Sequence, residues 1–579
     1  MSRIIFFFLF FPAFTKTAIG QVVIRNTNVV DVINRKILSG YDVVTRNGQI
    51  ASVQKTSLPQ YLAGETVIDG TGKYLIPGFC DAHVHFFQSG SMFARPDAID
   101  LRKSKPYADE IKYSHDNMED FLRRYTAAGI TSVIDVGSTY SFLDQRDSFA
   151  NKPYAPQVAM TGALLTTYIP PAFKDVPKND IPFIMMRTDD SVRLSVRELK
   201  AGGADFIKIW YIVLDADKEK GARKNLPLVQ AVIDEAHKNN MRVAVHATER
   251  ITAQLAVEAG ADYLVHNVED EVLTPAFVQL LKNKQVVLCP TMVVAGNYRK
   301  AFGHNYHFTA DELSIVNPFT AGTLIDFPLP DTSVGNRYIR SMNSPRNKAL
   351  QAHTDSVLSV NLKMLQDGGV TIATGTDAGN IGTQHAGSFF NELKAMKDAG
   401  LDMWDLLVNS TINGAKAMGN ESNTGSVTKG KTADMVLLNA NPLDSLTNWR
   451  TINYVINRGI AMRPSELLNN SPEMVVQQQL DAYNLQDMDA FLNTYDDSIK
   501  IYDLKGHIIL KNKADMRRAY SRAFLVPGTH CRLLNRMLQG NNVVDHEEIT
   551  VPGGPKPFYG IVLYRVEKGK IISVSLVRE

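Results

Sequence analysis

Residues 76–85 read Ile-Pro-Gly-Phe-Cys-Asp-Ala-His-Val-His, and the interpretation of the whole chain starts from them. Pro77-Gly78 breaks the chain, and residues 79–85 have the composition of a short buried strand that ends in polar side chains. Alternate side chains of a strand point to the same side, so His83 and His85 can hold one metal ion. Two unrelated histidines in a loop are the alternative, because a lone His-x-His pair recurs by chance.

Four later apolar segments carry polar side chains that suit the same site. They are residues 204–210 with Lys208, 241–246 with His246, 262–266 with His266, and 370–377 with Asp377. Helix-like segments such as 228–239 and 251–259 lie between them. Strands that alternate with helices indicate a parallel sheet with crossover helices. Polar residues at the C-terminal ends of many such strands predict an α/β fold with a (β/α)8 barrel, whose sites lie at that face.

On these residues, the chain resembles the amidohydrolase superfamily over residues 21–465. The ordered set is His-x-His, Lys, His, His and Asp, and residues 425–438 (Gly-Ser-Val-Thr-Lys-Gly-Lys-Thr-Ala-Asp-Met-Val-Leu-Leu) are similar to the family's return strand. Within the superfamily, the chain resembles the two-metal branch related to secreted Xaa-Pro and Xaa-Arg dipeptidases and, more loosely, imidazolonepropionase. It departs from many relatives at Thr248, where they carry His or Tyr, and at Asn267, where they carry Gly.

The resemblance implies two divalent metal ions, and four imidazoles with one carboxylate suit zinc. It implies that His83, His85 and Asp377 bind the first metal and that His246 and His266 bind the second. Burial near positive charge lowers the pKa of a lysine, and the neutral amine can capture carbon dioxide. The resemblance implies this fate for Lys208, whose carbamate would bridge the two metals. A structural lysine that reaches solvent is the alternative.

The implied chemistry is hydrolysis of a carbonyl compound. Two such metals would activate a shared water for attack on the carbonyl carbon, and one of them would polarise the carbonyl oxygen. Asp377 is the predicted catalytic residue, because it would take the proton and pass it to the leaving amine.

Three residues are candidate substrate contacts. Arg250 follows His246 by four residues and could meet a carboxylate through its planar guanidinium group, or it could lie on the surface of the following helix. His385, at the end of Gly-Asn-Ile-Gly-Thr-Gln-His, resembles a family histidine near the substrate, with a capping or supporting role as the alternative. Tyr168 follows the third predicted strand and would wall the pocket, unless it simply packs there.

The flanks of the barrel predict further units. Residues 21–77 and 424–465 form a composite β-sandwich, with Asn47-Gly48 as a hairpin turn. Residues 78–423 form the barrel, and the insertion 291–346 before the eighth strand should cover the site as a lid. Residues 472–579 resemble a SnoaL-like, nuclear-transport-factor-2-like α+β cone, preceded by a linker.

Size, charge and the N-terminus limit the class of protein. A chain of 579 residues indicates two or three domains, and a net charge of +2 gives no reason to expect nucleic acid as a partner. Arg3 precedes an apolar run at residues 4–14, which is shorter than the ~20 residues that span a bilayer. Residues 1–20 therefore predict a cleaved signal peptide and a secreted or periplasmic protein without a stable membrane anchor. A retained anchor is the alternative.

We therefore expect a secreted metal-dependent hydrolase of C–N amide bonds in small substrates, either dipeptides or N-acyl amino acids, that could form a homo-oligomer. A hydrolase of cyclic amides, imidazolones or lactones is the first alternative. Lys208 counts against the imidazolone version, because such family members generally use one metal and lack this lysine. A non-catalytic small-ligand-binding protein is the second alternative, and the complete ligand set counts against it.

Overall fold

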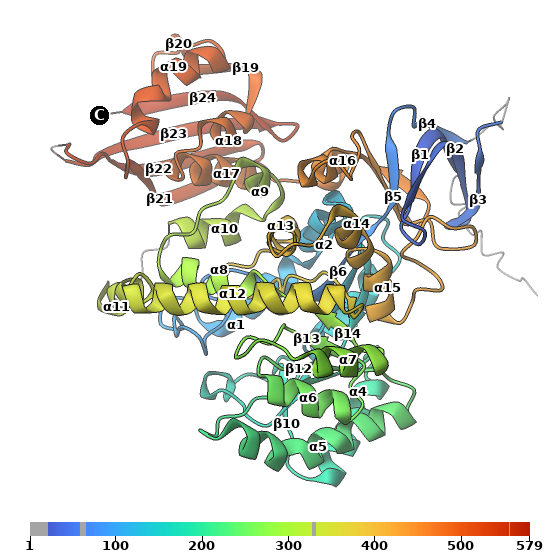
Figure 1. Cartoon of the computed structure of the whole chain (residues 1–579). Helices are drawn as coiled ribbons and strands as arrows, with labels where there is room; N and C mark the ends of the chain where they lie inside the picture. The colour runs from blue at the N-terminus through green and yellow to red at the C-terminus, as the bar shows by residue number, and fades with distance from the viewer. Residues whose placement is uncertain (1–20, 58–64, 327–331, 555, 579) are drawn as a thin grey trace, which may run out of the picture.

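The computed structural model describes residues 21–57, 65–326, 332–554 and 556–578. The predicted signal peptide, residues 1–20, lies outside the described residues. Figure 1 shows the barrel with its helices, a β-sheet on one side of it that contains the N-terminal strands, and a C-terminal domain on the other side. The long helix α12 (Pro345–Asp367) crosses the middle of this view.

Eight parallel strands form the barrel. They are β6 (Phe79–Val84), β7 (Ile130–Asp135), β8 (Gln157–Met160), β11 (Ile207–Trp210), β12 (Val243–His246), β13 (Tyr263–Val265), β14 (Val287–Cys289) and β15 (Thr371–Ile372). The Asp205 N–H donates to the Met160 carbonyl (2.9 Å) between the third and fourth barrel strands. The Ala82 N–H donates to the Thr374 carbonyl (2.8 Å) between the first and eighth. These bonds close the ring, and the predicted α/β barrel is confirmed.

Helices cover the outside of the barrel. They are α1 (Tyr107–Asp116), α2 (Met118–Ala127), α3 (Tyr140–Phe149), α4 (Asp189–Ala201), α5 (Lys218–Lys238), α6 (Arg250–Glu258), α7 (Pro275–Asn283), α13 (Phe389–Asp398), α14 (Met403–Asn409) and α15 (Ile412–Met418). Helix α4 begins with a capping box at Thr188 and buries Val192, Val196 and Leu199, which lie on one helical face. Two short strands, β9 (Leu164–Thr166) and β10 (Phe183–Met185), extend the sheet beside β11.

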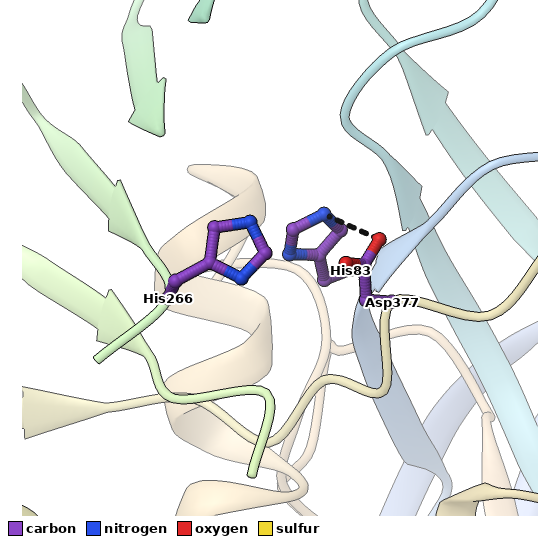
Figure 2. Close-up of side chains that lie close together, drawn as sticks. All are labelled: His83, His266 and Asp377. Atoms are coloured by element: carbon purple, nitrogen blue, oxygen red, sulfur yellow. Dashed lines mark ion pairs between the residues drawn. The ribbon is translucent and has the colours of Figure 1, made fainter. Parts of the chain in front are cut away.

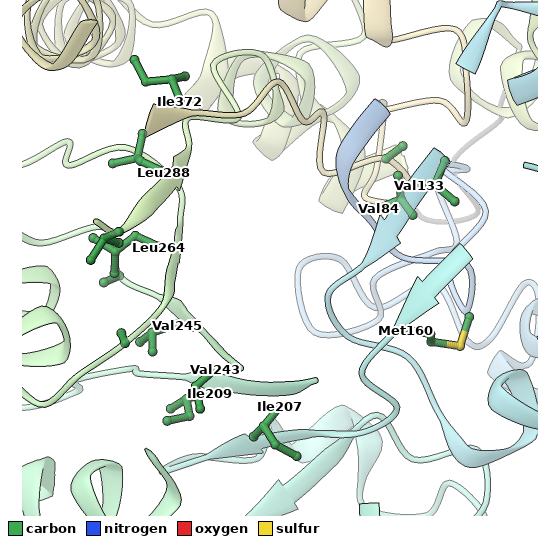
Figure 3. Packing of buried hydrophobic residues seen from close by; sticks show 14 of the residues in the cluster. Val84, Val133, Met160, Ile207, Ile209, Val243, Val245, Leu264, Leu288 and Ile372 are labelled. Carbon is green, nitrogen blue, oxygen red and sulfur yellow. The ribbon is translucent and has the colours of Figure 1, made fainter. Parts of the chain in front are cut away.

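Successive side chains along a barrel strand point alternately into two apolar clusters, one outside the barrel and one inside it. Ile207 and Ile209 on β11, and Val243 and Val245 on β12, belong to the outer cluster that packs against the helices. Figure 3 shows such outward side chains on all eight strands. Ala244 on β12 belongs instead to the cluster inside the barrel. Because side chains alternate along a strand, the residues between the outward ones face the barrel interior.

The N-terminal strands and the returning strands form one sheet beside the barrel. Its strands are β1 (Val22–Asp31), β2 (Lys36–Arg46), β3 (Gln49–Lys55), β4 (Thr66–Asp69), β5 (Tyr74–Pro77), β16 (Met435–Leu438), β17 (Ile452–Asn457) and β18 (Ile460–Met462). Strand β16 pairs antiparallel with β5, which joins the two flanks of the chain. At the β2–β3 turn, Asn47 and Gly48 have φ of 50° and 78°, the left-handed pair that a type I′ turn requires.

The long connection between β14 and β15 is helical. It contains α8 (Val294–Phe302), α9 (Ala310–Ile315), α10 (Pro318–Ile325), α11 (Thr332–Met342) and α12. Asn317 begins α10, and its side-chain oxygen accepts from the Phe319 and Thr320 N–H groups, while Pro318 takes the first helical position. Helix α8 lies over the open end of the barrel, where Val294, Ala295 and Tyr298 line the cavity described below. We call residues 294–326 and 332–342 the lid.

The C-terminal domain packs a six-stranded sheet against helices. Its elements are α17 (Pro472–Asn484), α18 (Met488–Asn493), β19 (Tyr495–Tyr502), β20 (Ile508–Leu510), α19 (Lys513–Phe524), β21 (His530–Gln539), β22 (Asn542–Thr550), β23 (Phe558–Glu567) and β24 (Lys570–Arg578). Two helices, α17 and α18, precede the first strand of this domain, which starts at Tyr495. The predicted linker before it contains the short helix α16 (Pro464–Leu467).

The lid and the C-terminal domain share one hydrophobic cluster. Leu313 and Leu324 of the lid belong to the same buried group as Val475 and Val476 of α17. The His530 ring also pairs with the Asp326 carboxylate at the end of α10, with 2.7 Å between Nε2 and Oδ1. The lid therefore lies between the barrel and the C-terminal domain. Among the helices of the described residues, none is both long enough and apolar enough to cross a membrane.

Candidate metal centre

His83 and His85 reach the barrel interior because β6 is irregular. Its register against β7 shifts between Asp81 and Val84. Cys80 and Ala82 face the interior, whereas Val84 belongs to the outer cluster, so the shift reverses the alternation within the strand. After the shift, His83 and His85 lie on the inner side, with 3.2 Å between their Nε2 atoms.

Asp377 completes a compact group of three donor atoms. Its Oδ1 lies 3.1 Å from His83 Nε2 and 3.0 Å from His85 Nε2. A metal ion held at 2.0–2.2 Å by tetrahedral ligands separates its donor atoms by about 3.3–3.6 Å. The three atoms therefore form a triangle slightly smaller than one face of the tetrahedron that the ligand atoms of such an ion form. Figure 2 shows His83 and Asp377 directed at each other and His266 beside them.

Backbone hydrogen bonds hold this triangle across the closure of the barrel. The Asp377 N–H donates to the His83 carbonyl (2.7 Å), and the His85 N–H donates to the Ala378 carbonyl (2.8 Å). A side chain at Gly375 would not fit, because its Cβ would lie 2.4 Å from Cys289 Sγ and 2.7 Å from the His83 nitrogen. The first and eighth strands can approach this closely only because residue 375 is glycine.

Lys208, His246 and His266 line the other side of the same space. Lys208 lies between the outward residues of β11, and His246 follows the outward Val245 on β12, so plain alternation turns both inward. His266 lies two residues after the outward Leu264, so regular alternation would turn it outward as well. Its left-handed backbone, with φ of 76°, turns the ring toward the cavity instead. Its ring lies 4.3 Å from that of His246 and 5.0 Å from that of His83, measured between centroids.

Hydrogen bonds orient two of the four imidazoles, those of His85 and His266. His85 Nδ1 donates to the Gly137 carbonyl (2.7 Å), which leaves Nε2 with a free lone pair beside Asp377. His266 Nδ1 lies 2.7 Å from the Thr291 hydroxyl oxygen, to which it can donate. Such partners orient the ring of a metal-binding histidine and fix which nitrogen binds the ion. One ligand atom each from His83, His266 and Asp377 lies within 4.8 Å of the others.

The electrostatics of the site suit neutral imidazoles and an ionised carboxylate. Burial lowers the pKa of His83 to about 4 and holds the pKa values of His246 and His266 well below their ordinary value. Burial alone would raise the pKa of Asp377, but the electrostatic attraction and hydrogen bond of His83, whose Nε2 lies 3.1 Å away, outweigh it and keep this pKa well below its usual range. These are the protonation states in which such residues bind metal ions.

Lys208 is buried, with 2% of the residue exposed. Burial lowers the pKa of its amine to about 7, although the negative charge of Asp377 opposes this effect. A substantial fraction of the side chain is therefore uncharged near neutral pH, which is the form that can react with carbon dioxide.

A cavity of about 340 Å³ opens above these six residues. One wall carries Arg95, Tyr298 and Asn380, which sequence reasoning missed. Asn380 Nδ2 donates to Asp377 Oδ1 (2.6 Å), and Asn380 Oδ1 accepts from Arg95 Nη1 and from the Tyr298 hydroxyl, each at 2.7 Å. The network connects the lid to Asp377. Asn380 was detectable as a polar residue just after the eighth strand, whereas Arg95 and Tyr298 carry no comparable signal.

The three predicted substrate contacts do not line this cavity. Arg250 begins α6, where its guanidinium group pairs with the Glu271 carboxylate and the Gln254 side chain, both at 2.6 Å. His385 is buried behind the site, where Nε2 donates to the Gln88 carbonyl (2.8 Å) and Nδ1 lies 3.1 Å from the Tyr125 hydroxyl. Tyr168 is half-buried beyond β9 and is absent from the lining. Side chains such as Phe183 and Trp210 form the apolar wall instead.

Solved structures share this fold. A Xaa-Pro dipeptidase with bound methionine is 21% identical, with a TM-score of 0.55 over 77% of this chain and all of the other. Ochratoxinase of A. niger is 19% identical, with a TM-score of 0.57 over 77% of this chain and 96% of its own. Phenylurea hydrolase B is 17% identical, with a TM-score of 0.59 over 77% and 97%. At these identities the likeness concerns the fold.

Sequence similarity to curated proteins is local. An adenine deaminase of Ruegeria sp. (strain TM1040) is 40% identical over 87 residues, which are 14% of this chain and 14% of that protein. A dihydroorotase of Sulfurihydrogenibium sp. (strain YO3AOP1) is 35% identical over 73 residues, or 13% and 16% of the two chains. The chain thus spans only about a seventh of the length of the curated relatives it matches.

Family models cover much more of the sequence. The SnoaL-like domain model matches residues 476–574, which confirms the predicted C-terminal domain. The Amidohydrolase family model matches residues 74–461, well over half of the chain. The chain therefore belongs to the amidohydrolase family of metal-dependent enzymes that act on carbon–nitrogen bonds.

Proposed function

We propose that the protein hydrolyses C–N amide bonds in dipeptides or N-acyl amino acids and uses two divalent metal ions, with zinc as the best match to the donor set. The observation that carries the proposal is the convergence of Asp377 Oδ1 and two histidine Nε2 atoms within 3.0–3.2 Å, beside a buried lysine.

The residues present fit two ions. His83, His85 and Asp377 would hold the first, and His246 and His266 would hold the second. Lys208 would bridge them as a carbamate, and the lowered pKa of its amine supports this role. When bound, two such ions supply an activated water and polarise the substrate carbonyl.

Asp377 is the residue that moves the proton. Its carboxylate is ionised at neutral pH, so it can accept a proton from the attacking water and then give it to the leaving amine. The Asn380 amide holds Oδ1 of this carboxylate in place through its hydrogen bond of 2.6 Å. Val294 and Tyr298 of the lid line one side of the cavity in which this step would occur.

Two observations support a small substrate. A cavity of about 340 Å³ lies at the lower end of the range for small-molecule sites, about 300–1,000 Å³. A Xaa-Pro dipeptidase with bound methionine is among the proteins of the same fold. We extend a peptide-like substrate from that protein to this chain as part of the proposal.

The test is a screen of the metal-loaded protein against dipeptides, N-acyl amino acids and lactones, with metal content measured on the same sample. We expect two metal equivalents and release of free amine from linear amides. Hydrolysis of lactones or cyclic amides alone would favour the first alternative, a hydrolase of cyclic amides, imidazolones or lactones. A protein without bound metal and without activity would favour the ligand-binding alternative.

We also propose that the protein is exported, on the basis of the apolar run before Gly20. N-terminal sequencing of exported protein should begin at or near Gln21. Recovery of an intact Met1 chain in the membrane fraction would contradict this proposal.

A further inference from the structure

Arg95 lines the cavity, but its hydrogen-bonding groups are largely occupied. Its Nε and Nη2 groups donate to the two carboxylate oxygens of Asp97, at 2.8 and 2.6 Å. Its Nη1 group donates to Asn380 Oδ1 (2.7 Å) and to the Tyr298 hydroxyl (3.2 Å). Asp97 neutralises this guanidinium group, so Arg95 offers little attraction to an anionic substrate.

Glu269 differs from Arg95, because no partner neutralises its charged side chain among the described residues. It lies on the loop after β13, lines the same cavity and is exposed. Among the described residues, its carboxylate has no hydrogen bond or ion pair, whereas the neighbouring Glu249 pairs with Lys218 (3.3 Å). The nearby Arg299 on the lid exerts only a longer-range attraction, and its Nε donates to the Ala295 carbonyl. The cavity therefore carries an uncompensated negative charge away from the proposed metal ligands.

Asn267 provides a second acceptor on the same loop. It lines the cavity with 1% of the residue exposed. Its Nδ2 donates to the Leu358 carbonyl (2.8 Å), which fixes the orientation of the amide. Its Oδ1 is buried and has no partner among the described residues. A buried acceptor without a donor is unfavourable, so a ligand that brings an N–H group would satisfy this oxygen.

We propose that Glu269 and Asn267 bind a cationic nitrogen of the substrate, an ammonium or a guanidinium group, and so set the substrate class. This inference rests on the proposed amide hydrolase function. Glu269 supplies the compensating charge, and Asn267 Oδ1 accepts one N–H. Phe183, Trp210 and Leu358 line the same cavity and can bury the apolar stem next to such a nitrogen. The cation can be the α-amino group of a dipeptide or a basic side chain.

Matched substrates separate these two sources. Alanyl-alanine is compared with lactoyl-alanine, in which a hydroxyl group replaces the α-ammonium. Alanyl-lysine and lysyl-alanine are compared with their norleucine counterparts, which lack the side-chain ammonium. Each pair is measured on wild-type enzyme, on Glu269→Gln and on Glu271→Gln as a control. Glu271 is half-exposed, pairs with Arg250 and does not line the cavity.

We expect the wild-type enzyme to favour the cationic member of at least one pair by about ten- to a hundredfold in kcat/KM, as for a hydrogen bond to a charged group. The Glu269→Gln variant should lose this preference and keep its rate on the neutral member, with unchanged metal content. Asn267→Ala should reduce the same preference, and Glu271→Gln should retain it. Which pair responds identifies the source of the cation.

Hydrolysis of both members at equal rates in every pair would overturn the inference and leave the proposed function standing. If no substrate is hydrolysed, the proposed function fails, and a binding measurement still decides the inference. Pentylamine and pentanol are titrated calorimetrically into the metal-loaded wild-type enzyme and Glu269→Gln. We expect pentylamine to bind at least tenfold more weakly to the variant, and equal binding would refute the inference.

Discussion

The two halves of the proposed ligand set are built in different ways. His83, His85 and Asp377 come from the first and eighth strands, and backbone hydrogen bonds across the barrel closure hold their donor atoms 3.0–3.2 Å apart. Lys208, His246 and His266 come from three consecutive barrel strands, and the two imidazoles of this group meet by ring packing. Backbone hydrogen bonds between the two strands fix the positions of the first half. In the proposed function, the second half depends instead on the negative charge of a carbamate on Lys208.

Removal of Lys208 should reveal the difference between the two halves of the ligand set most clearly. In Lys208→Ala, the first half keeps its geometry and retains up to one metal, whereas the second half loses the bridging anion and its metal. Activity should fall by several orders of magnitude, because the shared activation of water is lost. Folding should change much less, since the barrel core is apolar. Metal analysis and rates on a good substrate check this prediction.

Two companion experiments make the Lys208 prediction specific. Lys208→Arg should not restore activity, because a guanidinium group stays charged and cannot form a carbamate. A short carboxylic acid added to Lys208→Ala should restore part of the rate by occupying the gap. Two retained metals with near-parental activity in Lys208→Ala would refute the bridging role.

Removal of one supporting hydrogen bond in each half should have smaller and distinct effects. Asn380→Leu removes the donor to Asp377, and Thr291→Val removes the partner of His266. Such partners contribute about 10–100-fold in metal affinity or activity. We expect Asn380→Leu to lower kcat even at saturating metal, because Asp377 also carries the proton in the proposed function. Thr291→Val should recover most of its rate in excess metal. Identical metal dependence in both variants would contradict the difference between the halves.

The smallest expected effect concerns His385, which lies behind the first half. Burial lowers its pKa from 6.5 to about 4. Because the folded-state pKa lies below the unfolded one, the unfolded chain binds this proton first as the pH falls. His385 therefore contributes to the free energy of unfolding above pH 6.5, and this contribution is lost between pH 6.5 and about 4. The loss at pH 5 is about 2 kcal/mol.

His385→Phe should reduce the fall in thermal stability between pH 7.5 and pH 5, whatever constant cost the lost hydrogen bonds add. Measurement of the unfolding midpoint against pH, at fixed metal content, checks this. His304→Gln is the matched control, because His304 is an exposed histidine in the lid. A pH slope equal to that of the wild-type protein would show that His385 keeps an ordinary pKa.

The sequence predicted the barrel because its strands and helices alternate with a regular period, and it placed Lys208 and His246 by that same period. It did not predict how the other ligands turn inward. The register shift in β6 and the left-handed backbone at His266 and Asp377, with φ of 76° and 62°, are local deviations from strand geometry. Their presence follows from contacts between distant segments, such as the close approach at Gly375.

The predicted substrate contacts lie away from the cavity for a related reason. Arg250 has the right distance from His246 along the chain, but Glu271 on the next loop pairs with it. The network of Arg95, Tyr298 and Asn380 joins three segments that are far apart in sequence. Pairings of this kind depend on which loops meet above the barrel, and no periodicity in one segment encodes them.

The packing of the lid on the C-terminal domain sets an order of events during synthesis. The lid helices leave the ribosome before α17 and the strands that complete their hydrophobic cluster. Between α10 and β23 lie roughly 230 residues, which take about 10–50 s to translate at 5–20 residues per second. During this interval the lid has been synthesised, but the part of the C-terminal domain that packs against it is incomplete. Until α17 has been made, Leu313 and Leu324 of the lid lack the apolar partners that Val475 and Val476 provide in the folded protein.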